Sequence, residues 1–424
     1  MSLLFALAAC SGSKPKPAPA PVAPPPTPPP VASAPTPAPA PAPTPAPPPA
    51  APTGTDFAAQ AITLYTVGAC GGESSDARFD KHVVADHCDE LHADFKAYKK
   101  EWADQATAFI AQLRPADLPK TVVYPFGGGD LTSALVVFPD ATEITTISLE
   151  AAGDVRTIDH VKKGTLRTEL DEIAHNVNRL FRSAHSTTKS LQAVSHATIP
   201  GTVVFALAGL AVHDMEPLSF RYFDLDPEGN IVYLDEAELD RRATEMAGEI
   251  ADRDKHPKRD WHWWYEQESA FANMEITYRP KGDPNAAPRV YRHIVANLDD
   301  THTNADARVI KHLEQKGKVA VMTKAASFLL WYDDFTNIRN YLLGHIAWMI
   351  SDASGIPPSY AGPAGYEQIT YGDFTGPYFL KDPKNTRAEF IKLWKDQPHR
   401  KLPFRFGYPD AAKNAHMMIT KPKS

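Results

Sequence analysis

Apolar side chains recur at helical spacing in several stretches of the chain. Between residues 75 and 114 they lie three or four positions apart, which places them on one face of an α-helix. Pro115 and Pro119 follow and predict the end of that helix. The same spacing predicts helices near 166–181, 239–250, 305–315 and 325–347. The apolar positions of the first helix are Leu91, Phe95, Tyr98, Trp102, Ala106, Phe109 and Leu113.

Short apolar runs between these helices predict strands. Residues 121–124 and 144–149 are such runs, and a glycine-rich turn and a short helix at 131–138 join them. Units of strand, turn, helix and strand build parallel sheets. We therefore expect an α/β fold, a mixed sheet with flanking helices that contains this unit at 121–150. Further strands are predicted at 202–210, 274–278, 290–298 and 319–323, a hairpin at 219–234, and mainly loops over the last fifty residues.

The distribution of proline divides the chain. Half of the 40 prolines lie between Pro15 and Pro52, where they alternate mainly with alanine. Such a segment buries little apolar surface and favours polyproline II, which rises about 3.1 Å per residue. We expect 10–54 to be a disordered, extended tether that reaches on the order of 100 Å. Residues 55–424 are expected to form one globular α/β domain.

The first residues resemble the signal of a bacterial lipoprotein. An apolar stretch ends in Leu7-Ala8-Ala9-Cys10, which is similar to the lipobox of that family. The resemblance implies that residues 1–9 are a signal peptide and that Cys10 is lipidated. It also implies a place in the cell envelope, and Ser11 favours the outer membrane. A complete signal peptide has a positively charged residue before its apolar stretch, and no Lys or Arg precedes the stretch here. The alternative is an apolar N-terminus with an unrelated cysteine.

The two remaining cysteines, Cys70 and Cys88, have a structural interpretation. An even number of cysteines in an exported protein favours a disulfide. Closing a loop of this length adds roughly 3 kcal/mol to stability in the chain-entropy model. The alternative is two unrelated buried thiols.

The charge of the chain argues against a nucleic-acid partner. The net charge is −7, and no run rich in Lys and Arg stands out, whereas a polyanion usually requires a basic face. The expected partners are a membrane, through lipidated Cys10, and an envelope component, glycan or protein. No cofactor is expected, and a divalent metal is kept open as an alternative.

The turn Gly127-Gly128-Gly129-Asp130 is a candidate ligand site. It follows a buried strand and precedes a helix, where glycines let backbone amides approach a phosphate or nucleoside. Glu150 ends the next strand, where Rossmann-like folds hold a ribose. The unit also resembles, loosely, the first βαβ unit of class I S-adenosylmethionine methyltransferases. Two points argue against a nucleotide site: the spacing of the glycines is not G-x-G-x-x-G, and nucleotide cofactors are scarce outside the cytoplasm. The structural alternative is a tight turn that needs glycine for its positive φ.

Acidic residues and histidines follow two other predicted strands. His213-Asp214-x-Glu216 follows 202–210, and Asp299-Asp300-x-His302 follows 290–298. If these strands are parallel to the first, their polar ends converge on one sheet edge and could support acid–base chemistry or bind a divalent metal. The alternative is solvated polar residues at strand ends. The candidate catalytic residues are Asp130, Asp299 and His302, and the candidate ligand-binding residues are Gly127, Gly128, Gly129, Glu150, His213 and Glu216.

Two further patterns each have two interpretations. The acidic residues between Asp224 and Asp235 have the spacing of an EF-hand loop, but strands rather than helices are predicted around them. A hairpin turn at 226–230 is therefore the better interpretation. The aromatic cluster Trp261-His262-Trp263-Trp264-Tyr265 is typical of a packed core and, as the alternative, of a sugar-stacking surface.

The globular part also resembles a group of uncharacterised bacterial exported proteins. The resemblance lies in Tyr124-Pro125-Phe126-Gly127-Gly128-Gly129-Asp130, followed by Phe138-Pro139 and Leu149-Glu150. It implies one fold over 115–420 and no known activity. Two function classes remain. One is an envelope lipoprotein with a binding or structural α/β body. The other is an envelope hydrolase or transferase that uses carboxylates and histidine, with a degenerate Rossmann or methyltransferase-like domain as a further alternative.

Overall fold

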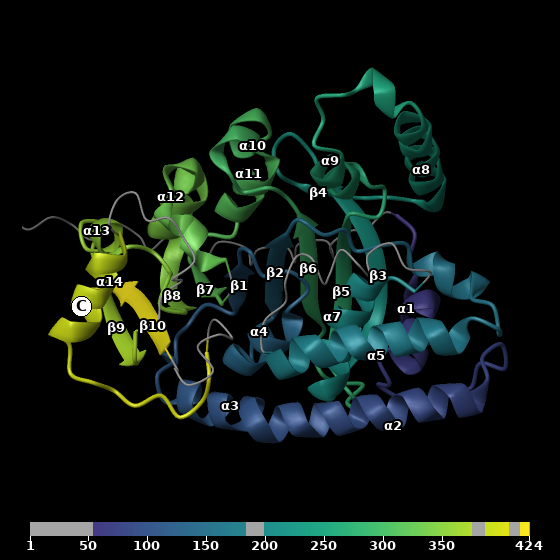
Figure 1. The fold of residues 1–424 in the computed structure, drawn as a ribbon, viewed down its shortest axis with the longest axis horizontal. Helices are drawn as coiled ribbons and strands as arrows, with labels where there is room; N and C mark the ends of the chain where they lie inside the picture. Colours follow the sequence, from purple (N-terminus) through teal and green to yellow (C-terminus); the bar gives the residue numbers. More distant parts are fainter. Residues whose placement is uncertain (1–53, 184–198, 325, 375–385, 407–415, 424) are drawn as a thin grey trace, which may run out of the picture. The chain divides into compact units, whose positions relative to one another are not determined.

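The computed structural model describes residues 54–183, 199–324, 326–374, 386–406 and 416–423 (Figure 1). The chain divides into two units, Met1–Ala50 and Ala51–Ser424, and all described residues belong to the second. The predicted signal peptide, Cys10 and nearly all of the predicted tether therefore lie outside the described residues. No helix among the described residues is long and apolar enough to cross a membrane.

Ten strands of the described residues form one mixed sheet in the order β4-β3-β5-β6-β2-β1-β7-β8-β10-β9. The five neighbours from β6 to β8 are parallel, and antiparallel strands extend the sheet on both sides. The fold is therefore mixed α/β, as predicted. The strands are β1 Thr121–Tyr124, β2 Glu143–Ser148, β3 Met215–Leu225, β4 Ile231–Tyr233, β5 Asn273–Pro280, β6 Arg289–Val295, β7 Val319–Thr323, β8 Ile346–Ser351, β9 Tyr366–Gly372 and β10 His416–Pro422.

Helices cover both faces of the sheet (Figure 1). Side chains of β1 alternate between the two faces. Val122 packs with α1, α2, α3, α4, α5 and α7 in one apolar core, and Val123 packs with α11 and α12 in the other. The helices are α1 Ala58–Val67, α2 Lys81–Tyr98, α3 Asp104–Ala111, α4 Leu131–Val137, α5 Leu166–Ser183, α7 Gly201–Val212, α8 Glu236–Ala251, α9 Trp261–Glu268, α10 Asp300–Ala305, α11 Arg308–Glu314, α12 Thr336–His345, α13 Pro358–Ala361 and α14 Thr386–Asp396.

The long helix predicted over 75–114 is present as α2 and α3, joined by a π-helical turn at Lys99–Ala103. The predicted apolar face is buried: Leu91 and Ala106 are fully inaccessible, and Tyr98 and Trp102 are nearly so. A disulfide joins Cys70, in the loop after α1, to Cys88 in α2, with Cα atoms 5.3 Å apart.

The strand predicted at 202–210 is wrong, because these residues form helix α7. This helix is apolar on all sides and almost completely buried, as a helix in the centre of a helical layer must be. An apolar run of this kind has no periodicity that distinguishes helix from strand. The last fifty residues were predicted to be mainly loops, and the described part of them contains α14 and β10, which the prediction missed.

Candidate functional site

The order of the parallel strands reverses between β1 and β7. From β1 the chain passes through α4 to β2 on one side, and from β7 it passes through α12 to β8 on the other. Helix α4 packs in the first apolar core and α12 in the second, so the two connections leave the sheet toward opposite faces. In open α/β sheets, ligands bind in the crevice that this reversal creates at the carboxyl ends of the strands.

A hollow of about 340 Å³ lies at this edge. Residues that follow β1, β2, β6 and β7 line it, and its volume falls in the range of roughly 300–1,000 Å³ usual for small-molecule sites. Phe126 and Phe335 form part of its apolar wall, with ring centroids 5.9 Å apart in an edge-to-face arrangement. The polar side chains of the lining belong to Ser148, Glu150, Asn297 and Asp299. We call this space the switch-point hollow.

The glycine turn forms one rim of the switch-point hollow. Gly128 lines the hollow and has φ +54°, a conformation that side chains disfavour. A Cβ at Gly127 would lie 2.7 Å from a ring atom of Tyr124, so this position has no room for a side chain. A Cβ at Gly129 would make only ordinary contacts. The turn therefore needs glycine at two of its three positions for its own geometry.

Glu150 is held at the end of β2 by a buried network. The residue is 1 % exposed and lines the switch-point hollow. Its carbonyl lies 2.7 Å from Nε2 of His293 on β6, and its backbone N–H donates to Oγ of Ser148 at 3.2 Å. Burial lowers the pKa of His293, although the carbonyls of Glu150 and Gly128 oppose this shift. The neutral imidazole thus ties β6 to the residue that follows β2.

Asp299 also lines the switch-point hollow and pairs with His302. Its carboxylate accepts a hydrogen bond from the backbone N–H of His302 at 3.0 Å, which caps α10, and lies 2.7 Å from Nδ1 of the imidazole. Burial opposes ionisation of Asp299, but the hydrogen bonds from His302 outweigh it and hold the pKa of Asp299 below its usual value. The ring of His302 lines two adjoining hollows. Such a carboxylate–imidazole pair can orient a ring for proton transfer.

Asp130 lies on the other side of the glycine turn, in a small hollow of about 20 Å³. One carboxylate oxygen accepts from the backbone N–H of Ser133 at 3.0 Å. The other accepts from Tyr124 Oη at 3.2 Å and from Lys324 Nζ at 3.1 Å. Lys324 is 3 % exposed and also donates to Oγ of Ser133 at 2.5 Å. Burial lowers the pKa of Lys324, and Asp130 opposes that shift.

The three candidate catalytic residues therefore do not line one hollow. Asp299 lines the switch-point hollow and neighbours His302, whereas Asp130 lines the small hollow with Lys324. Lys324 and Ser133 were not among the predicted site residues. The sequence signal for Lys324 was a single lysine directly after an apolar strand. Its partner Asp130 lies 194 positions away in the chain, so the pairing could not be predicted from the local sequence.

His213 and Glu216 lie outside the switch-point hollow. His213 ends α7, and its Nε2 lies 3.1 Å from the carbonyl of Thr132. Glu216 is the second residue of β3 and pairs with Arg279 at 2.7 Å. Since β3 runs in the same direction as β6, its first residues lie at the edge where the parallel strands begin. These two residues therefore do not join Glu150 and Asp299.

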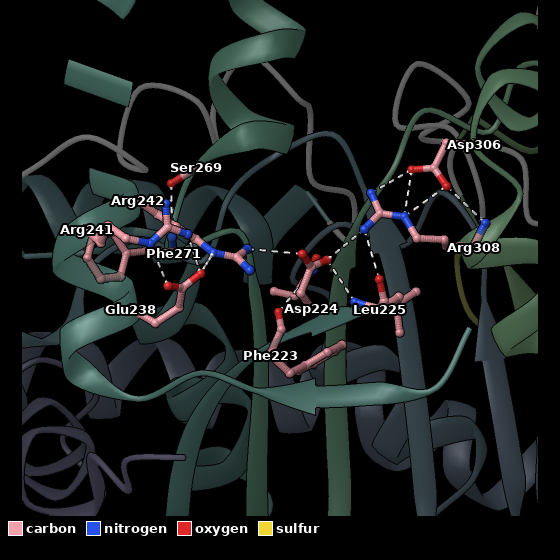
Figure 2. Close-up of polar contacts among 11 residues, drawn as sticks. Phe223, Asp224, Leu225, Glu238, Arg241, Arg242, Ser269, Phe271, Asp306 and Arg308 are labelled. Carbon is pink, nitrogen blue, oxygen red and sulfur yellow. Dashed lines mark hydrogen bonds and ion pairs between the residues drawn. The ribbon is translucent and has the colours of Figure 1, made fainter. Parts of the chain in front are cut away.

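The acidic residues with EF-hand-like spacing have structural partners. Figure 2 shows Asp224 between the guanidinium groups of Arg242 from α8 and Arg308 from the start of α11, at 3.0 and 3.2 Å. Asp226 accepts hydrogen bonds from the backbone of Glu228 and Asn230 and so closes the predicted hairpin turn. Among the described residues, no group of three or more His, Cys, Asp or Glu side chains is placed to hold a metal ion.

The aromatic cluster lies in α9. Trp264 is buried and packs edge-to-face on Trp261, with ring centroids 4.9 Å apart, and the guanidinium of Arg259 lies over its ring. These contacts favour the packing interpretation for Trp264. The side chains of His262 and Trp263 lie outside the described residues.

Comparison with other proteins assigns no function to this site. No family model, curated protein or solved structure matches the chain. Any function must therefore be argued from the switch-point hollow itself.

Proposed function

We propose that the α/β body binds a small ligand that carries vicinal hydroxyl groups and a flat or apolar ring. The observation that carries the proposal is Glu150, an acidic residue two positions after the end of β2 that lines the switch-point hollow together with Gly128 of the glycine turn. In doubly wound sheets, an acidic residue about 20 positions after the glycine turn accepts hydrogen bonds from ribose hydroxyls. Glu150 follows Gly129 at that distance.

The other lining residues fit the remainder of such a ligand. Phe126, Phe335 and Leu298 offer apolar contact to a ring. The carboxylate of Asp299, which also lines the hollow, is a hydrogen-bond acceptor for a second polar group of the ligand. A hollow of mainly apolar lining with a few acceptors is the usual form of a small-molecule site.

Two sources supply a ligand of this chemistry. The first is a nucleoside, for which S-adenosylmethionine is the natural first compound to test, because the unit at 121–150 resembles the first βαβ unit of the class I methyltransferases. The second is a sugar, which is abundant in a cell envelope. Both present vicinal hydroxyls to a carboxylate.

Isothermal titration of the purified chain with S-adenosylmethionine, adenosine and simple sugars tests the proposal. Replacing Glu150 by Gln removes a charged acceptor, and hydrogen bonds to charged groups contribute about 1.5–3 kcal/mol. We therefore expect the affinity to fall by about tenfold or more. The exposed Glu90 on α2 supplies a matched control, Glu90→Gln. A ligand that binds both variants equally well would contradict the role of Glu150.

We also propose that this body is carried by a lipid anchor at Cys10 and held off the membrane by the tether of residues 10–54. The support is the lipobox-like Leu7-Ala8-Ala9-Cys10 and the prolines that follow it. Metabolic labelling with an alkyne fatty acid, followed by membrane fractionation, tests the anchor. The wild-type chain is expected to carry label in the membrane fraction, and Cys10→Ala to carry none. Equal labelling of Cys10→Ala refutes the anchor and leaves the ligand proposal untouched.

A further inference from the structure

We infer that the ligand of the switch-point hollow is an uncharged oligosaccharide, which extends from this hollow into a groove beside α8 and α9. The inference rests on the proposed function and deepens it, because it chooses the sugar over the nucleoside and requires a chain of several sugars. It comes from two observations. Three hollows adjoin in a row, and the charges that line the last of them are balanced.

The segment after β6 connects the three hollows. Ala296 and Asn297 line the switch-point hollow and also a narrow hollow of about 50 Å³. His302 lines the narrow hollow and also a groove of about 700 Å³, which we call the α8–α9 groove because residues of these two helices line it. The switch-point hollow therefore leads through the narrow hollow to the α8–α9 groove.

A chain of ion pairs forms a wall along this route. Figure 2 shows Asp224, near the end of β3, between the guanidinium groups of Arg308 and Arg242, at 3.2 and 3.0 Å. Asp224 and Arg308 line the narrow hollow, and Arg242 lines the α8–α9 groove. The wall thus continues from one space to the next without a break in its contacts.

The volumes indicate a ligand longer than one ring system. The α8–α9 groove is about twice as large as the switch-point hollow. A nucleoside or a single sugar held at Glu150 would leave this groove unfilled. The side chain of His302 is 33 % exposed and lies where the narrow hollow meets the groove, so it can contact the middle of a longer chain.

The charges of the α8–α9 groove favour an uncharged chain. Among the described residues, four basic and four acidic side chains line it. Several of them form pairs, such as Arg241 with Glu245 at 2.5 Å and Arg259 with Glu249 at 2.8 Å. A charged ligand would have to compete with these pairs, whereas a hydroxyl group both donates and accepts hydrogen bonds and can contact either member. A sugar chain carries such hydroxyls along its whole length.

The donors of the groove are also held in place. The guanidinium of Arg259 lies over the ring of Trp264, 4.7 Å from its centroid, while it contacts Glu249. Trp264 is buried, so the ring provides a fixed support for the guanidinium. Donors that are ordered before binding lose less conformational freedom when the ligand arrives.

Isothermal titration of the full chain with sugars of increasing length tests the inference. The probes are glucose and N-acetylglucosamine, each with its β-1,4-linked dimer and tetramer, beside adenosine and S-adenosylmethionine. The tetramer of galacturonic acid serves as an anionic chain of the same length. We expect the tetramer of at least one neutral series to bind about tenfold or more tightly than its monomer, because one further hydrogen bond to a charged side chain suffices for that factor.

The other outcomes separate the inference from the proposed function. Equal affinity for every length, or binding of adenosine or S-adenosylmethionine without any sugar, overturns the inference and leaves the proposed function standing. Tighter binding of the anionic tetramer than of the neutral tetramers overturns the uncharged ligand. If no compound binds, the proposed function fails and the inference fails with it.

A paired change then tests the α8–α9 groove. Arg259→Ala with Glu249→Ala removes a donor and an acceptor and keeps the net charge of the groove. The ratio between the tetramer and monomer affinities is expected to fall by about threefold or more. The matched control is Lys392→Ala with Asp396→Ala, which removes an exposed pair on α14 and is expected to leave the ratio unchanged. A folded Arg259 and Glu249 variant that keeps the full ratio overturns the role of the groove. The wild-type length series decides the inference even where the variant does not fold.

Discussion

Replacing Lys324 by methionine tests whether the charge pair under the glycine turn stabilises the fold. Methionine has a similar length and no charge, so the change removes the ammonium group and little else. Among the described residues, the Asp130 carboxylate, 13 % exposed, then keeps Tyr124 Oη and the N–H of Ser133 as partners. It loses the counter-charge that contacts it.

The expected loss is about 3–5 kcal/mol, since breaking a buried ion pair on one side leaves its partner uncompensated. Removing both charges in Lys324→Met with Asp130→Asn is expected to cost less than the sum of the two single changes, because neither charge is then left alone. This non-additivity distinguishes a coupled pair from two independently placed side chains.

The assay is urea unfolding at pH 7, followed by circular dichroism and by tryptophan fluorescence to check that both report one transition. The control is Lys392→Met. Lys392 pairs with Asp396 on α14, and both side chains are more than half exposed. Exposed pairs contribute about 0–1 kcal/mol. A loss for Lys324→Met no larger than that of the control would refute the reasoning.

Three further changes test other parts of the structure. Burial lowers the pKa of His312 to about 4, below the usual value of about 6.5. The neutral form therefore stabilises the fold above pH 6.5, and on the order of 3 kcal/mol is lost as the pH falls toward 4. His312→Asn should flatten this part of a stability profile, and an unchanged profile would contradict the assignment. Reducing the Cys70–Cys88 disulfide should lower the free energy of unfolding by roughly 3 kcal/mol, and urea unfolding with and without reductant checks this; a coincident midpoint would count against it. Gly127→Ala should cost about 1–3 kcal/mol through overpacking, whereas Gly164→Ala, with no atom within 4 Å of the added Cβ, should cost far less in the same assay.

The elements that were predicted correctly are those whose sequence pattern lies within one short stretch of the chain. The unit at 121–150 combines an apolar strand, glycines and a helix within thirty residues, and β1, α4 and β2 appear as predicted. Helix α7 was mistaken for a strand because its burial on all sides erases the helical period. Strand β10 pairs with β8 and β9, and this long-range pairing has no counterpart in the local sequence.

The candidate site was predictable only where its residues follow parallel strands. Glu150 follows β2 and Asp299 follows β6, and these two strands pair directly, so the sheet brings both residues to one hollow. Glu216 was expected there too, but it starts a strand rather than following one. Lys324 could not be assigned, because its role depends on Asp130, and only the fold brings the two together.

The proposed location of the protein bears on which ligand the switch-point hollow binds. Nucleotide cofactors are scarce outside the cytoplasm, so an envelope protein with a glycine turn of this kind would have little use for a phosphate seat. In this chain Ser133 donates its N–H to the Asp130 carboxylate, and Asp130 and Leu131 donate theirs to the carbonyls of Gly127 and Gly129. Lipidation of Cys10 together with binding of an unphosphorylated sugar would join these features in one account. A cytoplasmic, unlipidated protein that binds S-adenosylmethionine would instead favour the nucleoside as the ligand of the switch-point hollow.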